Sequence, residues 1–456
     1  MSLFVAVLVE WVIVISRIRC WRVCSAKTGC IQRYVFRRGL IWCGMPLPLM
    51  AQETSLFSSG QVIFQKNGRA PMSVAVRPTF AQVDLGALRA NYHAVSSYVR
   101  TGDMKPVVIA VVKANGYGHG AVAVAQALEE AGAAMLACAD IEEGVELRRG
   151  GILAPILVFG ALSVSDLDGV FTYDLIPTVS SPAAARALKD AATRRGIRVS
   201  CHLKIDTGMN RFGFRFDNLG QTVPDVVRGA ALDVEAVYTH FATADDRVHP
   251  LFNLQCARFK DALGCLGELG VQPRLRHAAN SAALVRDQAT WYDGVRPGLL
   301  LYGLTPPGCP RPLSLTPALT LRSRVVAVKG MRAGETAGYG ARRPVTRPTT
   351  VAVVPAGYAD GLDVRLAGRC SVLVRGRLAP IVGAVSMDSM TIDVTGLEVV
   401  PGDEVVIVGS QAGSRIGVEE VAAAIGTVPY EILCRTGSRI VRSYEGRSGP
   451  ALADGE

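Results

Sequence analysis

A single lysine stands where a run of apolar residues gives way to a glycine-rich segment. Residues 107–112 form a short, β-branched run without alternation, which is typical of a buried strand, and Lys113 opens the segment 113–120. Burial of a lysine lowers the pKa of its amine, because it disfavours the charged form. An unprotonated amine suits Schiff-base or general-base chemistry. The spacing alone leaves open a lysine that merely reaches solvent from the end of a strand.

Four other segments place polar side chains at the ends of apolar runs. Their candidate residues are Lys204 and Arg211 in 202–213, His240 in 238–245, His277, Asn280 and Ser281 in 276–281, and Arg296, Gly298 and Leu299 in 295–299. The guanidinium of Arg211 is a fork of N–H donors, which suits hydrogen bonds to a carboxylate or phenolic oxygen. Plainer interpretations are solvated loop charges for Lys204 and Arg211 and a core histidine for His240.

Two further motifs lie in the last third of the chain: Ala-Gly-Tyr-Gly at 337–340 contains Tyr339, and Val-Ser-Met-Asp-Ser at 385–389 contains Met387 and Asp388. The lysine segment and these motifs, in this order, resemble those of the alanine racemases, fold-type III enzymes that use pyridoxal 5′-phosphate (PLP). The resemblance covers residues 72–445. It implies interconversion of L-alanine and D-alanine, supply of D-alanine for peptidoglycan, and PLP bound covalently to Lys113.

The resemblance also implies which residues hold the cofactor. They are Lys113, Tyr117, His240, Asn280, Ser281, Arg296, Gly298, Leu299 and Tyr358. Hydroxyl groups of Tyr117, Ser281 and Tyr358 would contact the phosphate. Backbone N–H groups of Gly298 and Leu299 would do the same, at the usual late-strand phosphate site of a barrel.

Three basic residues have electronic roles by the same resemblance. Arg296 would face the pyridine nitrogen, where many PLP enzymes place a carboxylate. A guanidinium does not readily release a proton, so the ring nitrogen would stay unprotonated, which disfavours transamination. Arg211 would bind the cofactor's phenolic oxygen and help hold the substrate carboxylate. Lys204 would be carbamylated and would present an anion to Arg211.

Racemisation requires that a proton leaves one face of Cα and returns on the other. The resemblance assigns Lys113 as the base for D-alanine and Tyr339 as the base for L-alanine. A free tyrosine has a pKa near ~10, and a His277–Arg296 relay would lower it. Tyr339 and the substrate-binding Met387 would enter the partner subunit's active site, which implies a homodimer. The plainer alternatives are a turn tyrosine and a core methionine.

The order of elements predicts a barrel that positions these residues. Eight apolar runs are predicted as strands, at 107–113, 135–139, 155–160, 174–178, 198–206, 233–242, 274–280 and 294–303. Helical patterns between them include 122–131, 182–195 and 252–269. Eight strand–helix alternations favour a (β/α)8 barrel over an open sheet. Such a barrel carries its functional residues at the C-terminal ends of the strands, where Lys113 stands.

Beyond a proline-rich link the pattern changes. Residues 318–445 hold many short β-rich runs separated by turn signals, which predicts an all-β domain. The predicted domains are a PLP-binding barrel at 72–308 and a β domain at 309–456. The alternating strand 80–85 has no partner in the barrel and is expected to pair with the β domain.

Residues 1–71 are predicted to be a disordered N-terminal extension. They carry nine Lys/Arg against two Asp/Glu, so most of the net charge of +10 lies there and indicates no nucleic-acid partner for the rest. The apolar run 3–15 is too short to span a bilayer and lacks a preceding basic region. A misplaced start, with Met72 as the natural first residue, predicts a cytoplasmic enzyme without a membrane partner. A real targeting segment predicts an exported one.

Cysteine usage and the motifs leave a short set of functions. The 11 cysteines show no CxxC pair and no zinc-like spacing, so reduced thiols and no metal are expected.

Besides an alanine racemase, the alternatives are a racemase of broader specificity and a non-catalytic PLP-binding protein on the same barrel. The β-domain motifs argue against the latter. Ser386 stands where the family pattern has cysteine, which leaves the size of the substrate open.

Overall fold

The computed structural model describes residues 77–100, 105–160 and 167–446. The predicted extension at 1–71 and the expected start at Met72 lie outside these residues. The barrel and the β domain both belong to the unit that begins at Arg77. Within the described segments, no helix has the length and apolar character needed to cross a bilayer.

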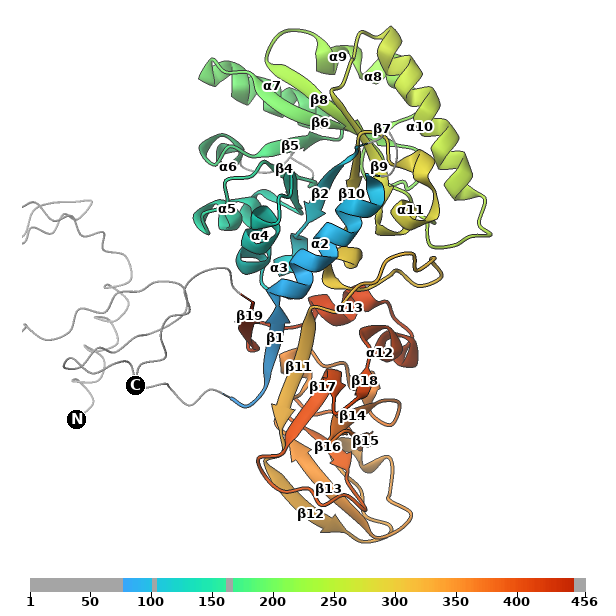
Figure 1. The fold of residues 1–456 in the computed structure, drawn as a ribbon. Coiled ribbons are helices and arrows are strands. Elements are labelled where there is room, and N and C mark those ends of the chain that lie inside the picture. The colour runs from blue at the N-terminus through green and yellow to red at the C-terminus, as the bar shows by residue number, and fades with distance from the viewer. Residues whose placement is uncertain (1–76, 101–104, 161–166, 447–456) are drawn as a thin grey trace, which may run out of the picture. The chain divides into compact units, whose positions relative to one another are not determined.

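Eight parallel strands close into a barrel (Figure 1). In barrel order they are β2 (Val107–Val111), β3 (Met135–Cys138), β4 (Ile156–Val158), β5 (Ile176–Val179), β6 (Val199–Asp206), β8 (Leu232–Tyr238), β9 (Leu275–Asn280) and β10 (Gly294–Arg296). The ring is closed because β10 pairs with β2 and β5 pairs with β6. Most residues of these strands are buried, as expected when helices cover the outside and side chains fill the inside. The predicted (β/α)8 barrel is confirmed.

Helices follow the strands and cover the barrel. They are α4 (Ala121–Glu130), α5 (Ile141–Arg149), α6 (Asp168–Thr172), α7 (Pro182–Arg195), α8 (Leu219–Thr222), α9 (Pro224–Val227), α10 (Leu251–Glu268) and α11 (Ser281–Arg286). Local signals start them: Asp140 caps α5 by accepting the Glu143 N–H at 2.9 Å, and Ser181 caps α7. The helices predicted from the sequence agree with α4, α7 and α10 within one residue at each end.

The prediction of an eighth strand at 294–303 was correct for its first three residues and wrong for the rest. β10 ends at Arg296, and a short 3-10 helix, η2, spans Leu299–Tyr302. All four residues of η2 are buried, so the run is apolar on every side and its pattern cannot separate strand from helix. The early end of β10 leaves Gly298 at the rim of the barrel, in the loop between strand and helix.

A second sheet forms the β domain (Figure 1). In spatial order its strands are β12 (Ala327–Met331), β13 (Thr349–Val354), β16 (Met390–Asp393), β15 (Arg377–Val382), β14 (Ser371–Val374), β17 (Glu404–Gln411), β11 (Leu319–Arg324), β1 (Phe80–Asp84) and β19 (Val441–Glu445), with β18 (Ser414–Ile416) on β17. β1 precedes the barrel in the chain, yet it pairs antiparallel with β11 and parallel with β19. α2 (Leu85–Val99) then leads from β1 towards the barrel. The predicted β domain is confirmed, but it also holds two helices that the sequence pattern did not reveal, α12 (Val418–Ile425) and α13 (Pro429–Cys434).

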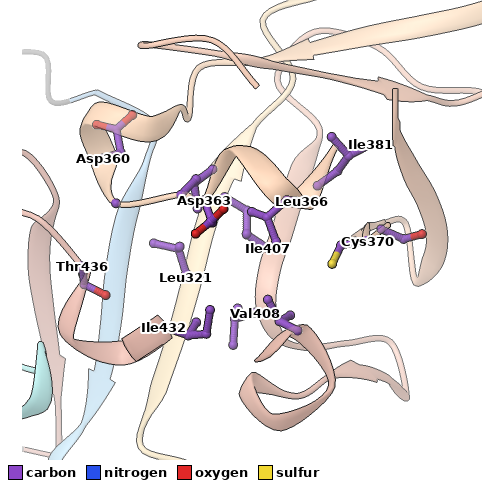
Figure 2. A pocket seen from close by; sticks show the side chains of 14 residues that line it. Leu321, Asp360, Asp363, Leu366, Cys370, Ile381, Ile407, Val408, Ile432 and Thr436 are labelled. Atoms are coloured by element: carbon purple, nitrogen blue, oxygen red, sulfur yellow. The ribbon is translucent and has the colours of Figure 1, made fainter. Parts of the chain in front are cut away.

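A gap of about 40 Å³ lies inside the β domain (Figure 2). Its lining is mostly apolar, with the carboxylates of Asp360 and Asp363 beside it. Both carboxylates are already bound: Asp360 accepts from Arg77 at 2.6 Å, and Asp363 accepts from Arg365 at 2.7 Å. The gap is therefore a packing feature of the core, and these ion pairs hold the loop that borders it.

Candidate active site

One cavity of about 440 Å³ lies at the C-terminal ends of the barrel strands. Residues that the sequence predicted as functional contribute much of its lining: Lys113, Tyr117, Lys204, Arg211, His240, Asn280, Ser281, Arg296, Gly298 and Leu299. They follow or end β2, β6, β8, β9 and β10. The barrel brings them together because the C-terminal ends of parallel strands meet at one edge.

Lys113 begins a tight left-handed turn. It opens the short element α3 (Lys113–Tyr117), in which residues 114–117 all have φ between 51° and 60°. Glycine adopts this conformation readily, whereas any other residue costs about 1–3 kcal/mol, so surrounding contacts must hold the turn. Burial, followed by the positive charge of Arg211, lowers the pKa of the Lys113 amine. The surroundings therefore make the proton of this amine easier to lose than that of a free lysine.

The last segment of the β domain packs against this turn. Arg442 donates to the carbonyl oxygen of Gly118 at 2.8 Å and to those of Thr436 and Ile440 at 2.8 Å and 3.0 Å. Gly118 has a φ of 81°, and a Cβ on it would lie 2.1 Å from the carbonyl oxygen of Leu433. Only glycine meets both conditions. The glycines that follow Lys113 therefore allow a second domain to approach the lysine turn.

The Arg296 guanidinium is buried and held by backbone and histidine acceptors. It donates to the carbonyl oxygens of Thr239, His277 and Ala278 at 2.7, 2.9 and 2.9 Å. It also donates to Nδ1 of His277 at 2.7 Å and to Nδ1 of His240 at 3.3 Å. Burial lowers the pKa of Arg296 to about 10, so the group remains a cation at neutral pH. The cavity thus contains a fixed donor that accepts no hydrogen bond.

A pair of histidines continues from Arg296. Because Arg296 donates to Nδ1 of His277, we place the ring proton on Nε2, which donates to Nδ1 of His202 at 3.1 Å. Tyr238 stacks on His277 with ring centroids 4.7 Å apart. Burial, followed by the charge of Arg296, lowers the pKa of both histidines, to about 3 for His202. Both rings are therefore neutral near pH 7, and the expected His277–Arg296 contact is formed.

Lys204 and Arg211 line the same cavity. Lys204 is buried, and its ammonium lies 5.6 Å from the ring centroids of Phe212 and Tyr238. Burial, followed by the positive charge of Arg211, lowers the pKa of Lys204 to about 7. Arg211 itself is exposed to the cavity. Near neutral pH the site therefore combines one available guanidinium with a lysine that is charged for only part of the time.

Hydroxyl groups and a backbone N–H meet at one corner of the cavity. The Gly298 N–H donates to Ser281 Oγ at 2.9 Å. A Cβ on residue 298 would lie 2.4 Å from the Tyr117 hydroxyl oxygen, so glycine permits this close approach. The Tyr117 ring lies 6.0 Å from the Tyr430 ring, centroid to centroid. Such a cluster of small donors at a late-strand end suits a phosphate group.

Tyr430 was missed by the sequence analysis, which named Tyr358 for this corner. Tyr430 lies in the first turn of α13 and lines the cavity, whereas Tyr358 is not among the lining residues and is 44% exposed. No local motif marks Tyr430, because it reaches the lysine turn only through the folding of the β domain. Other unpredicted lining residues are Val111, Ala114, Ala139, Phe159, Gly160, Phe212, Tyr238 and Cys434.

Tyr339 and Met387 also lie outside this cavity. Their side chains are 78% and 51% exposed. The loop that carries Met387 is bound to the loop that carries Tyr358, since the Tyr358 N–H donates to the Ser386 carbonyl oxygen at 2.9 Å and the Ala359 N–H to that of Met387 at 3.0 Å. Large exposed side chains on loops fixed in this way are suited to contact another molecule.

Comparison with known proteins agrees with the two-part fold. Residues 83–306 match the model of the alanine racemase N-terminal domain, and residues 318–444 match that of the C-terminal domain. An alanine racemase of Symbiobacterium thermophilum is 44% identical over 82% of this chain and 98% of its own. The crystal structure of alanine racemase from D-cycloserine-producing Streptomyces lavendulae has a TM-score of 0.78 at 36% identity, over 82% and 99% of the two chains. The Bartonella henselae alanine racemase structure, which holds covalently bound pyridoxal phosphate, has a TM-score of 0.71 at 28% identity, over 80% and 99%.

Proposed function

This chain belongs to the alanine racemase family and racemises alanine, and we propose that it does so with PLP held on Lys113 and with two bases. The observation that carries the proposal is the placement of the Lys113 amine in one cavity with Arg296 and the corner formed by Ser281 and Gly298. The covalently bound PLP of the Bartonella henselae relative supports the same cofactor. We further propose a cytoplasmic enzyme that supplies D-alanine for peptidoglycan.

The residues of the cavity fit PLP. Its phosphate would be held at the corner where Gly298 leaves room for the Tyr117 hydroxyl, with the Tyr430 ring nearby. Arg296 offers a charged donor to the pyridine nitrogen, and His240, whose Nδ1 already accepts from Arg296, would contact the ring. When bound, PLP supplies an electron sink that stabilises the carbanion left by the departing Cα proton.

Two bases on opposite faces of the substrate account for racemisation. The Lys113 amine would be free once the amino group of alanine has taken its place on PLP; its pKa is lowered by burial, and it then takes the Cα proton of D-alanine. The side-chain oxygen of the partner's Tyr339 takes the Cα proton of L-alanine. After one base has removed the proton, the other base returns a proton to the opposite face of Cα, while Arg211 binds the substrate carboxylate and the partner's Met387 limits the space for the side chain.

Lys204 fits the proposed carbamate. Carbamylation requires an uncharged amine, and burial lowers the pKa of Lys204 to about 7, so much of it is uncharged near neutral pH. The product would place a negative charge beside Arg211, which would hold that guanidinium for the substrate carboxylate. The modification therefore replaces a costly buried cation with an ion pair.

The exposed positions of Tyr339 and Met387 support a homodimer with shared sites. Mixing inactive Lys113→Ala chains with inactive Tyr339→Phe chains is expected to restore about one quarter of the wild-type activity. Half of randomly exchanged dimers are mixed, and each mixed dimer has one site with both bases intact. The measurement is racemase activity after subunit exchange, which tagged chains and native mass spectrometry verify. Verified mixed dimers without activity would place both bases in the same chain.

The test of the proposed function is a panel of single-enantiomer amino acids with the PLP-loaded chain, read by chiral chromatography. Fast conversion of alanine in both directions and slow conversion of serine and lysine is the expected result. Comparable rates for several amino acids would favour the broader racemase, for which Ser386 beside Met387 is the motivating feature. PLP binding without conversion of any amino acid would show a non-catalytic PLP-binding protein.

A further inference from the structure

The left-handed turn that carries Lys113 is bound by a carboxylate from a neighbouring helix. Oε1 of Glu143 accepts the Ala114 N–H at 2.7 Å, directly after the lysine. Oε2 of the same side chain accepts the Ala139 N–H at 2.7 Å, at the end of β3. One carboxylate therefore ties the end of strand β2 to the end of strand β3, with both oxygens in use.

The backbone at both ends of this tether is fixed by its own contacts. Glu143 lies in the first turn of α5, and its N–H is held at 2.9 Å by the capping residue Asp140. Ala114 has a φ of 53°, a conformation that a non-glycine residue adopts only when its surroundings hold it there. The hydrogen bond from Ala114 is thus placed where the chain would otherwise relax.

We propose that Glu143 is a positioning residue, which holds the lysine turn in its left-handed conformation and faces Lys113 with a negative charge. It does not touch substrate; it acts through the backbone that carries the lysine. The role deepens the proposed function, because it rests on Lys113 as the residue that holds the cofactor.

The Glu143 carboxylate acts on the charge of Lys113 in the opposite direction to the neighbouring arginines. The charged or titratable groups that interact with this amine include the cations Arg211 and Arg296, the partly charged Lys204, the His240 ring, the Cys434 thiol and Glu143. The cations repel a protonated lysine, whereas the Glu143 carboxylate attracts it. Glu143 is half-buried, so fewer water molecules screen its attraction to Lys113 than would screen it at an exposed position.

A glutamine at this position could not replace the tether. Its amide has one acceptor oxygen and one NH2 group, so one of the two backbone N–H groups would face a donor. Either the Ala114 or the Ala139 N–H would lose its partner, and the turn would open more often.

The test compares Glu143→Gln with Glu142→Gln, a matched control that removes the same charge from the same helical turn, at an exposed position that does not line the cavity. In the PLP-loaded full chain, amide hydrogen exchange of the peptide containing Ala114 is expected to be about tenfold faster in Glu143→Gln and unchanged in Glu142→Gln. Equal protection in both variants would overturn the positioning role, whatever their racemase activity.

A second readout follows the charge. In the chain without cofactor, the rate at which Lys113 reacts with an amine reagent is measured against pH. Loss of the facing anion is expected to move the midpoint of this pH profile to lower pH in Glu143→Gln, with no shift in Glu142→Gln.

The variant Glu143→Asp separates the charge from the tether. It should keep the midpoint of the pH profile, because its carboxylate retains the charge, and it should loosen the turn, because its side chain is shorter. If Glu143→Gln does not fold, Glu143→Asp with normal Ala114 protection would overturn the tether. Failure of PLP to label Lys113 at all would count against the proposed function instead.

Discussion

Replacing Lys113 with alanine is expected to reduce racemisation of both enantiomers by about 10,000-fold or more. The change removes the proposed anchor of the cofactor and the base for D-alanine together. It should not unfold the chain, because burial already lowers the pKa of this amine and its removal relieves a desolvation penalty. The measurement is the initial rate in each direction by chiral chromatography, with exposed Lys105→Ala as the control lysine.

The same assignment makes a labelling prediction. Borohydride treatment of the PLP-loaded wild-type chain should leave the cofactor on the peptide that contains Lys113, as mass spectrometry would show. Cofactor on another lysine, or a Lys113→Ala variant that still racemises alanine, would refute the assignment. The control Lys105→Ala should be labelled as the wild type is.

Replacing Tyr339 with phenylalanine is expected to act on one direction of proton transfer. If Tyr339 is the base for L-alanine, exchange of its Cα proton with solvent deuterium should fall by about 100-fold or more. Exchange at Cα of D-alanine should change much less, because Lys113 serves that face. Proton NMR of each enantiomer in deuterium oxide, before racemisation proceeds far, measures both rates.

The control for this variant is Tyr173→Phe, which removes the hydroxyl of a tyrosine outside the cavity that accepts a hydrogen bond from Arg149 at 3.1 Å. It should leave both exchange rates as they are. An equal loss for both enantiomers in Tyr339→Phe would show a single base or a purely structural tyrosine. Together with the mixed-dimer experiment, the result separates the identity of the base from the subunit that supplies it.

The barrel and most of its cavity could be predicted because the relevant signals are local. A buried parallel strand appears in the sequence as a short apolar run, and the polar residue after it stands at the catalytic edge of a barrel. Lys113, Lys204 and His240 illustrate this, since each lies near the end of an apolar run and each lines the cavity. The same signal fails at η2. All sides of this short helix are buried, so its apolar residues show no periodicity that would separate a helix from a strand.

The contributions of the β domain could not be predicted in the same way. Tyr430 reaches the cavity because α13 packs near the lysine turn, and a tyrosine in a short helix has no periodic signature of that contact. Tyr358 lies in a more conspicuous sequence, yet its loop is bound to the Met387 loop and Tyr358 does not line this cavity. Long-range packing, rather than the local pattern, decided between the two tyrosines.

By itself the sequence determined the fold class, the family resemblance and the groups available for chemistry, because strand periodicity and motif order are properties of the chain. Only the tertiary structure decided how those groups are charged and held. The lowered pKa of Lys204 arises from burial beside Arg211, and the tether from Glu143 to Ala114 joins residues 29 positions apart. Desolvation and hydrogen bonding depend on which segments meet in space, and the order of residues along the chain does not state this.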